Sequence, residues 1–224
     1  MTWWINENTG YHVNRKRVVR LTRLMGLEAI YPKPRLSTAH PEHRIYPYRL
    51  RGVRVTRPNQ VWSTDITYVR MAQGFLYLTA ILDWFSRYVL AWRISNSLDA
   101  HFCVEALQEA LELSPTKPEI FNTDQGVQFT ARQFTQCLES QNITISMDGR
   151  GRVFDNIFIE RLWRTVKYEH IYLHDHTTTA SLIDGLTNYW HLYNSERPHQ
   201  SLGNATPSEV FFGQAEAPQL AARR

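Results

Sequence analysis

Three consecutive runs of β-branched and aromatic residues constrain the fold of this chain most strongly. The runs cover residues 61–69, 75–83 and 87–94, and only Gly74 and a short segment at 84–86 separate them. Runs of this composition, divided by short turns, predict three sequential antiparallel strands.

Helical and strand-like segments alternate after the third run. The expected elements are a helix at 99–113 with Asp99 as its N-cap, a strand at 119–123, a helix at 130–140 capped by Thr130, a strand at 142–146, and helices at 154–168 and 178–194. Three strands followed by this alternation predict an α/β fold, with one mixed five-stranded sheet and helices on its faces.

Charge is divided unevenly along the chain. Residues 1–58 contain 12 Lys and Arg but three acids, whereas residues 59–224 contain 13 Lys and Arg and 18 acids. A basic arm joined to a mildly acidic body is typical of a protein that grips a polyanion, most often nucleic acid. With 224 residues, of which 43% are hydrophobic, the chain can bury a core, which excludes a disordered protein.

The basic arm is predicted to contain one helix and a linker. Residues 13–27 place apolar side chains at helical spacing among basic ones, and Gly26 is expected to end this helix. With little sequence before it, the helix is expected to be the remnant of a truncated helix-turn-helix unit. Five prolines within residues 31–58 predict an extended basic linker rather than packed structure. The expected domains are a basic, partly helical N-terminal arm at 1–57, a body at 58–213 and a flexible tail at 214–224.

Cysteine usage and targeting signals exclude further classes. Cys103 and Cys137 form no CxxC pair, which argues against a disulfide scaffold and against a cysteine zinc site. The first residues lack the pattern of a signal peptide, and no run approaches the roughly 18 apolar residues of a membrane span. The sequence therefore predicts a soluble cytoplasmic protein with no membrane contact.

Three acidic residues are candidates for one metal-binding site. Asp65 lies in the middle of a predicted strand, where a charge is disfavoured, and Asp124 follows the carboxyl end of another, where open sheets gather ligands. Glu160 lies on a polar, basic face of the helix at 154–168, together with Asn156, Trp163, Arg164 and Lys167. Such an acidic cluster needs cations, and oxygen ligands suit two Mg²⁺ ions that support phosphoryl transfer.

Four motifs carry a resemblance to a known family. They are STDIT around Asp65, NTDQGVQF around Asp124, SMDGRGRVFDNIFIERLWRTVKYE around Glu160, and the C-terminal YNSERPHQSLGNATPSEV. Together they closely resemble the second-frame transposases of bacterial insertion sequences, which share the retroviral integrase core. Thirty-five residues separate Asp124 from Glu160, and 35 is the spacing for which this DDE family is named.

The resemblance implies an RNase H-like core in which Asp65, Asp124 and Glu160 bind two Mg²⁺ ions, which Mn²⁺ can replace. It implies a transposase that acts in DNA recombination and integration. Such an enzyme uses water to nick the 3′ ends of an element and then joins the freed 3′-hydroxyls to target DNA. The residues expected to contact DNA, on the basic arm and near the acids, are Arg15, Lys16, Arg17, Arg20, Arg164, Lys167, Asn156 and Gln125. For Asn156 and Gln125, support of the acids is the alternative.

The same resemblance implies the partners. The transposase is expected to act on element ends and on target DNA as a homo-multimer, in the bacterial nucleoid. A separate or fused first-frame protein is expected to supply the main recognition of the ends. Two other functions fit part of the sequence: a truncated DNA-binding regulator without catalytic activity, and an RNase H-like nuclease that hydrolyses RNA in hybrids.

Two further groups of residues allow two interpretations each. His170, His174 and His176 could hold a metal, but their spacing fits no common zinc pattern and favours a solvated loop between two helices. The aromatic residues Trp163, Tyr189, Trp190 and Tyr193 could stack on bases, but their helical spacing is more typical of a core.

Overall fold

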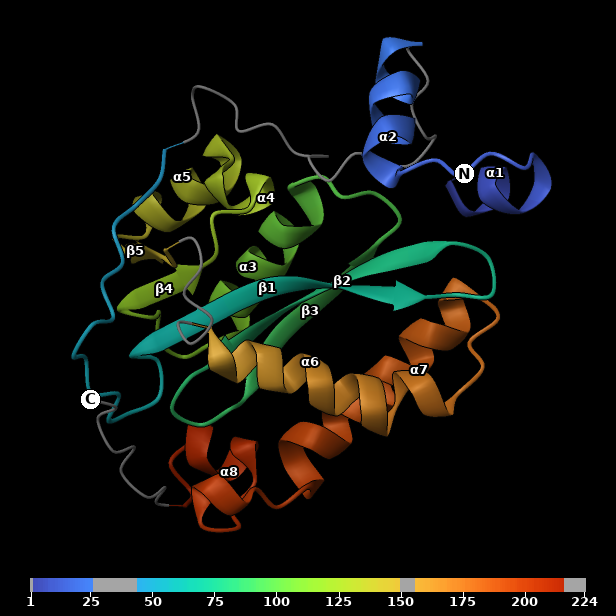
Figure 1. The fold of residues 1–224 in the computed structure, drawn as a ribbon. Helices are drawn as coiled ribbons and strands as arrows, with labels where there is room; N and C mark the ends of the chain where they lie inside the picture. The colour runs from blue at the N-terminus through green and yellow to red at the C-terminus, as the bar shows by residue number, and fades with distance from the viewer. Residues whose placement is uncertain (1, 26–43, 150–155, 216–224) are drawn as a thin grey trace. The chain divides into compact units, whose positions relative to one another are not determined.

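The computed structural model of the protein describes residues 2–25, 44–149 and 156–215 (Figure 1). Contacts divide the chain into two compact units, residues 1–38 and 39–224. The predicted end of the first helix at Gly26, the linker up to residue 43 and nearly all of the predicted tail lie outside the described residues.

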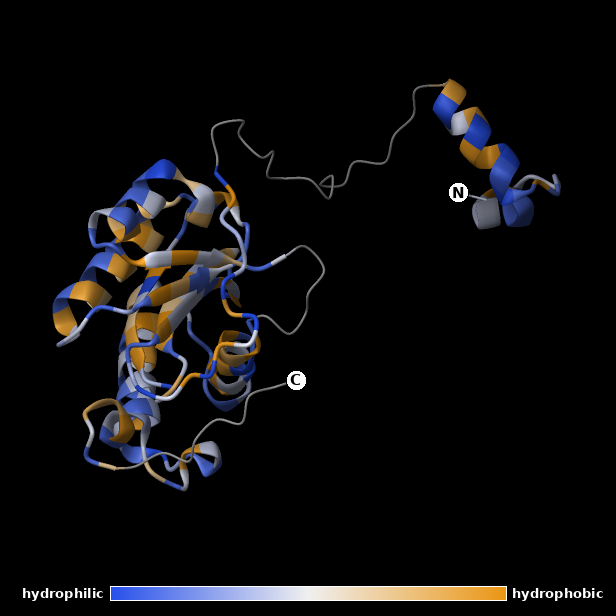
Figure 2. Ribbon diagram, turned by 90° about the vertical axis from the view of Figure 1, so that its left-hand side faces the viewer, coloured by the Kyte–Doolittle hydropathy of each residue, from blue (hydrophilic) through white to orange (hydrophobic). Residues whose placement is uncertain are grey.

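The first unit contains two helices, α1 (Thr2–Asn8) and α2 (Arg15–Leu24). Hydrophilic and hydrophobic residues alternate along α2, as its amphipathic pattern predicts (Figure 2). The Asn14 side chain caps α2 by accepting a hydrogen bond of 2.8 Å from the Lys16 backbone N–H. The Asn6 side chain accepts another of 2.8 Å from the Val13 backbone N–H, which ties α1 to the start of α2. The sequence predicted α2 but not α1.

The second unit is built on a mixed five-stranded sheet, as predicted. Its strands are β1 (Val61–Arg70), β2 (Phe75–Asp83), β3 (Val89–Ser95), β4 (Ile120–Thr123) and β5 (Thr144–Met147). They lie in the order β3-β2-β1-β4-β5. β1 pairs antiparallel with β2 and parallel with β4, while β2 with β3 is antiparallel and β4 with β5 is parallel. β1 is therefore the central strand, where the two kinds of pairing meet.

Helices cover both faces of this sheet (Figure 1). They are α3 (His101–Leu113), α4 (Val127–Thr130), α5 (Arg132–Ser140), α6 (Ile157–Glu169), α7 (Thr179–His191) and α8 (Pro207–Phe211), with short turns η1 (Ile171–Leu173), η2 (Leu192–Glu196) and η3 (Gln200–Leu202). Because successive strand residues point to opposite faces, β1 serves two cores: Trp62 packs with α3 and α5, and Val69 packs with α6 and α7. No helix in the described part of the chain is long and apolar enough to cross a membrane.

The two predicted helix caps have different outcomes. The N-cap residue of α3 is Ala100, one position after the predicted Asp99, although the Asp99 side chain does accept a hydrogen bond of 2.8 Å from the His101 backbone N–H. The prediction for Thr130 is wrong, because this residue ends the short helix α4 and its hydroxyl donates to the Gly126 carbonyl at 3.0 Å. α5 starts two residues later and has no side-chain cap.

Residues 44–58 correct the predicted linker. They contain no helix or strand, but they are packed rather than free. The Arg49 backbone N–H donates to the Ser146 hydroxyl at 3.0 Å, and that of Tyr46 approaches the Met147 sulfur at 3.5 Å. Leu50 is buried in a third hydrophobic cluster. The segment thus runs along β5, and the second unit begins before the predicted boundary at residue 58.

Asn194 joins the C-terminal helices to the edge strand β3. The residue lies in η2 and is buried. Its Oδ1 accepts a hydrogen bond of 3.0 Å from the Val89 backbone N–H, and its Nδ2 donates one of 2.9 Å to the Val89 carbonyl. The side chain therefore pairs with β3 in the way that the backbone of a further strand would.

We expect Asn194→Ala to lower the free energy of unfolding by about 2–4 kcal/mol, because it leaves two buried backbone groups of Val89 without partners. Urea unfolding followed by circular dichroism measures this change. Asn188→Ala, at an exposed position on α7, is the matched control and should stay within about 0.5 kcal/mol of the wild type. Equal stability of the two variants would show that the Asn194 bonds are dispensable.

Candidate active site

Parallel pairing of β1 with β4 brings Asp65 level with Asp124. The register places Ser63 opposite Asn122. Two residues further along both strands, the same register sets Asp65 beside Asp124, which directly follows the last residue of β4. Residues two apart on a strand share a face, so both carboxyl groups belong to one side of the sheet, at the point where β4 ends.

The Asp65 carboxyl lies in a confined and acidic environment. Its Oδ2 accepts a hydrogen bond of 3.0 Å from the Trp163 indole N–H. Burial, then the negative charge of Asp124 and then that of Glu160, raise the pKa of Asp65 to about 6, although two hydrogen bonds act in the opposite direction. Because both other acids act on Asp65 through their charge, the three carboxylates share one electrostatic environment.

The loop after β4 holds Asp124 in place. The Gly126 backbone N–H donates a hydrogen bond of 2.8 Å to Asp124 Oδ1. The carboxyl reaches solvent, but the surrounding protein still desolvates it and raises its pKa. A Cβ added to Gly126 would lie 2.9 Å from the same Oδ1. A side chain at position 126 would therefore have to shift the Asp124 carboxylate.

Helix α6 carries the third acid and the basic residues predicted beside it. Glu160 is exposed in the first turn of this helix. Lys167 is half-buried two turns later: burial lowers its pKa, and the charge of Asp65 acts in the opposite direction. Arg164 is exposed on the same helix. Glu160 and Lys167 of the predicted polar face thus both interact with Asp65 through their charges.

The position of Trp163 differs from the one predicted for it on the polar face of α6. The side chain is buried in the core beneath α6, yet its indole N–H reaches Asp65. Tyr189, Trp190 and Tyr193 are buried in the same core, which confirms the interpretation of these aromatic residues as core rather than as a surface for stacked bases.

Asn156 and Gln125 both make hydrogen bonds within the protein. Asn156, buried just before α6, donates from its Nδ2 to the Thr64 carbonyl at 3.4 Å, next to Asp65. Gln125 donates from its Nε2 to the Asp148 carbonyl at 2.8 Å. Of the two roles expected for these residues, the bonds favour support of the acids over contact with DNA.

Sequence reasoning missed a fourth acid at the same edge of the sheet. The register of β4 with β5 sets Asp148 level with Asp124, one residue beyond the end of β5. The Asn122 side chain donates a hydrogen bond of 2.9 Å to Asp148 Oδ1, and both residues are buried. Asp148 therefore links the ends of two strands beneath the site. Its position in the SMDG motif, just after a predicted strand, is the feature of the sequence that could have identified it as a residue of the site.

The carboxylates form a donor set that suits a hard divalent cation. Their oxygens are the ligands that Mg²⁺ prefers, and a cation would relieve the repulsion that raises the pKa of Asp65. The acids are less tightly gathered than another group of potential ligands. Within residues 2–25, 44–149 and 156–215, only a trio of histidines has its ligand atoms within 4.8 Å of one another.

The basic residues of the arm that are predicted to contact DNA lie on α2 in the first unit. They are all exposed: Arg15, Lys16, Arg17 and Arg20.

Two family models match the chain, and both are described as an integrase core domain. The first covers residues 55–152 and includes Asp65 and Asp124. The second covers residues 141–207 and includes Glu160. The matches thus span the sheet and the helices on both of its faces.

Curated relatives extend over nearly the whole chain. The transposase for insertion sequence element IS904 of Lactococcus lactis subsp. lactis (strain IL1403) is 30% identical over 215 residues, which cover 91% of this chain and 82% of the relative. The transposase for insertion sequence element IS629 of Shigella sonnei is 29% identical over 207 residues, which cover 90% of this chain and 69% of the relative.

Solved structures share the fold. The HTLV-2 integrase catalytic core domain in complex with magnesium aligns with a TM-score of 0.57 at 21% identity, over 69% of this chain and 97% of that one. A chain of the simian T-cell lymphotropic virus intasome in complex with PP2A regulatory subunit B56 gamma aligns with a TM-score of 0.64 at 16% identity. The alignment covers 95% of this chain and 75% of that one. These alignments confirm the RNase H-like fold. With the relatives above, they show that the chain belongs to the family of insertion-sequence transposases with an integrase core domain.

Proposed function

We propose that the protein nicks the 3′ ends of an insertion-sequence element and transfers the freed ends into target DNA, in a metal-dependent reaction. The observation that carries this proposal is the strand register that sets Asp65 level with Asp124, within the electrostatic reach of Glu160. In the proposal these three acids hold two Mg²⁺ ions, which Mn²⁺ can replace. Magnesium accompanies the HTLV-2 integrase core in its structure, and the oxygen donors here suit the same ion.

The residues of the chain prepare the site for this reaction. Bound metal ions would favour deprotonation of the attacking water or 3′-hydroxyl and neutralise charge on the leaving oxygen. The Trp163 N–H orients the Asp65 carboxyl by donating a hydrogen bond to its Oδ2. The Gly126 N–H orients Asp124 in the same way. Lys167, whose charge interacts with that of Asp65, is proposed to bind a phosphate of the scissile strand.

We assign DNA binding to basic residues on two helices. Arg164 and Lys167 lie on the helix of Glu160 and are proposed to contact the DNA of the element ends. The four basic residues of α2 are proposed to grip backbone phosphates, in a salt-dependent manner. Since an element has two ends, we propose that the protein acts as a homo-multimer on nucleoid DNA, with a first-frame protein recognising the end sequences.

The experiment uses the full chain and DNA duplexes that carry the ends of the element. With Mg²⁺ or Mn²⁺ we expect nicks at the 3′ ends and, after longer incubation, products joined to target DNA. Chelation of the metal with EDTA should abolish both products while leaving DNA binding intact.

Other outcomes would favour the alternative functions. A regulator would bind DNA with a steep salt dependence in EDTA and never cut it in Mg²⁺. A nuclease of this fold would cut the RNA strand of a hybrid and fail to join DNA ends. Either pattern would contradict the proposed transposition chemistry.

We expect Gly126→Ala to slow nicking by about 10- to 100-fold. The added methyl group would lie 2.9 Å from Asp124 Oδ1, and it would therefore displace the carboxylate. The φ of −60° at Gly126 suits alanine, so stability should hardly change. Nicking rates and melting temperatures measured side by side check this. A wild-type rate would show that the Gly126 contact does not position Asp124.

A further inference from the structure

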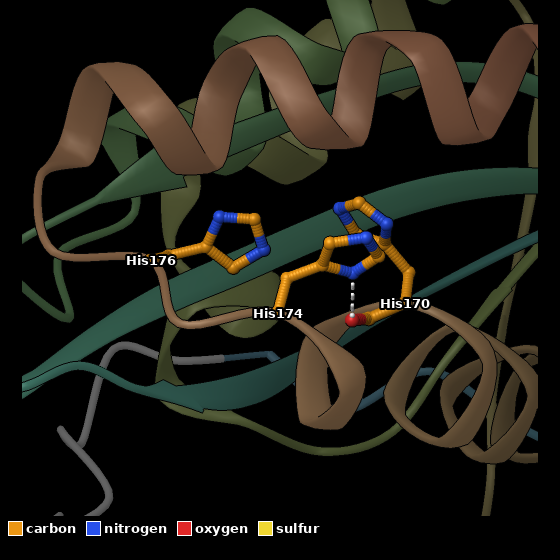
Figure 3. A group of neighbouring side chains, drawn as sticks. All are labelled: His170, His174 and His176. Atoms are coloured by element: carbon orange, nitrogen blue, oxygen red, sulfur yellow. Dashed lines mark hydrogen bonds between the residues drawn. The ribbon is translucent and has the colours of Figure 1, made fainter.

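Three histidines in the connection between α6 and α7 lie together, although their spacing favoured a solvated loop. His170 is the C-cap of α6, His174 follows the short turn η1, and His176 precedes α7. One ring nitrogen from each lies within 4.8 Å of the other two. Figure 3 shows the three rings directed toward one another. The single turn of η1 reverses the chain, so residues four and six positions apart can meet.

The hydrogen bonds of the rings leave one nitrogen of each available. His174 Nδ1 lies 2.8 Å from the His170 carbonyl oxygen, a bond drawn in Figure 3, and His176 Nδ1 lies 3.4 Å from the Ser181 hydroxyl. A bond from Nδ1–H to a carbonyl fixes the tautomer and presents Nε2 as a lone-pair donor, as in metal-bound histidines. The Nε2 atoms of His170 and His176 are buried, and neither has a hydrogen-bond partner in the described part of the chain.

The three rings line a cavity of about 780 Å³, which also includes Asp175. Gly185 of α7 faces the rings: a Cβ there would lie 2.7 Å from His170 Nε2 and 2.9 Å from His176 Cε1. A glycine inside a helix is unfavourable unless a close approach requires it, and the rings make that approach here.

We propose that His170, His174 and His176 form a binding site for a divalent transition metal, Zn²⁺ in the first place, separate from the carboxylate site. Three imidazoles are a ligand set typical of Zn²⁺, whereas Mg²⁺ selects oxygen donors. The cavity beside the rings leaves room for a water molecule as the fourth ligand.

Such a metal would fasten the end of α6 to the start of α7. His170 follows directly on the helix that carries Glu160 and Trp163, while His176 leads into α7. Binding of an ion to the folded chain stabilises it by mass action, so Zn²⁺ is expected to raise the melting temperature of the protein.

The test is a titration of the full, tag-free chain, stripped of metal, with Zn²⁺ or Co²⁺ in excess Mg²⁺ to saturate carboxylates. Calorimetry should give one ion per chain, and Co²⁺ should show the intense visible absorption of a tetrahedral site. We expect His174→Asn, at an exposed position, to weaken the affinity by about 100-fold, and Gly185→Ala by about 10-fold. His191→Gln, on α7 outside the trio, is the matched control and should bind as the wild type does.

Three results would overturn the proposal. They are the absence of stoichiometric Zn²⁺ binding by the wild type, equal affinity of the His174→Asn and His191→Gln variants, and loss of Zn²⁺ binding in Asp65→Asn with the trio intact. Far-ultraviolet circular dichroism shows whether each variant is folded. Since every readout is metal binding, the outcome does not depend on whether the protein transposes DNA.

Discussion

Asp65→Asn, Asp124→Asn and Glu160→Gln are each expected to slow 3′-end nicking and end joining by about 1,000-fold or more. Each substitution removes one negative charge and one proposed metal ligand at nearly constant volume. A loss of about 4 kcal/mol of transition-state stabilisation, within the range expected for metal catalysis, corresponds to that factor. Single-turnover assays with labelled element-end DNA in Mg²⁺ measure the rates.

Asp184→Asn is the matched control for these three variants. Asp184 is exposed on α7, so its loss of charge should leave the rate within about twofold of the wild type, as for other surface changes. A rate within tenfold of the wild type for any of the three acid variants would contradict the assignment of that residue to the metal site.

Stability provides an independent readout for Asp65. Its pKa rises from 3.8 to about 6 on folding, so the ionised carboxyl destabilises the metal-free fold at pH values above 6. This penalty decreases as the pH falls from 6 to 3.8, since the folded state then binds a proton that the unfolded state lacks. At pH 8 in EDTA, Asp65→Asn should therefore be more stable than the wild type by about 1–2 kcal/mol, while its activity is lost.

Most of the fold could be predicted from the sequence because strands carry a strong local signal. The β-branched runs located all five strands to within two residues of their ends. The cap at Thr130 was predicted wrongly because the four-residue helix α4 has too little periodicity to be recognised. The packing of residues 44–58 was missed for a different reason: their bonds to β5 come from backbone N–H groups, which leave no pattern in the side chains.

The sequence indicated the three candidate acids but not the residues that support them. Motifs identify Asp65, Asp124 and Glu160, whereas the bond between Asn122 and Asp148 depends on the register of β4 with β5. Registers follow from tertiary pairing and are not written in local composition. The spacing of the three histidines favoured a solvated loop for the same reason, because only the turn η1 brings their rings together.

Trp163 was the least predictable of these supports. A helical wheel places it beside Glu160 on the polar face, and its size suggests the core. In the structure both are true, since the ring is buried while its N–H reaches Asp65 Oδ2 at 3.0 Å. A wheel gives the direction of a side chain, but it cannot tell which polar atom lies beyond the helix.

Trp163→Phe is expected to slow nicking by about 10- to 100-fold and to raise the Mg²⁺ concentration needed for half-maximal rate. Phenylalanine keeps an aromatic ring in the core but removes the donor that orients Asp65. A carboxylate free to rotate would hold the metal less well, so saturating Mg²⁺ should restore part of the rate. Initial rates measured across a Mg²⁺ titration separate this effect from a loss of folded protein.

Trp190→Phe is a matched control, because Trp190 lies in the same core and its indole N–H is buried without a hydrogen-bond partner among the residues that the structure describes. Both substitutions reduce aromatic volume equally, and only that at Trp163 removes a hydrogen bond to Asp65. Equal slowing by the two would assign the effect to packing. Slowing by Trp163→Phe alone, partly reversed by Mg²⁺, would show that a core residue sets the geometry of the catalytic carboxylate.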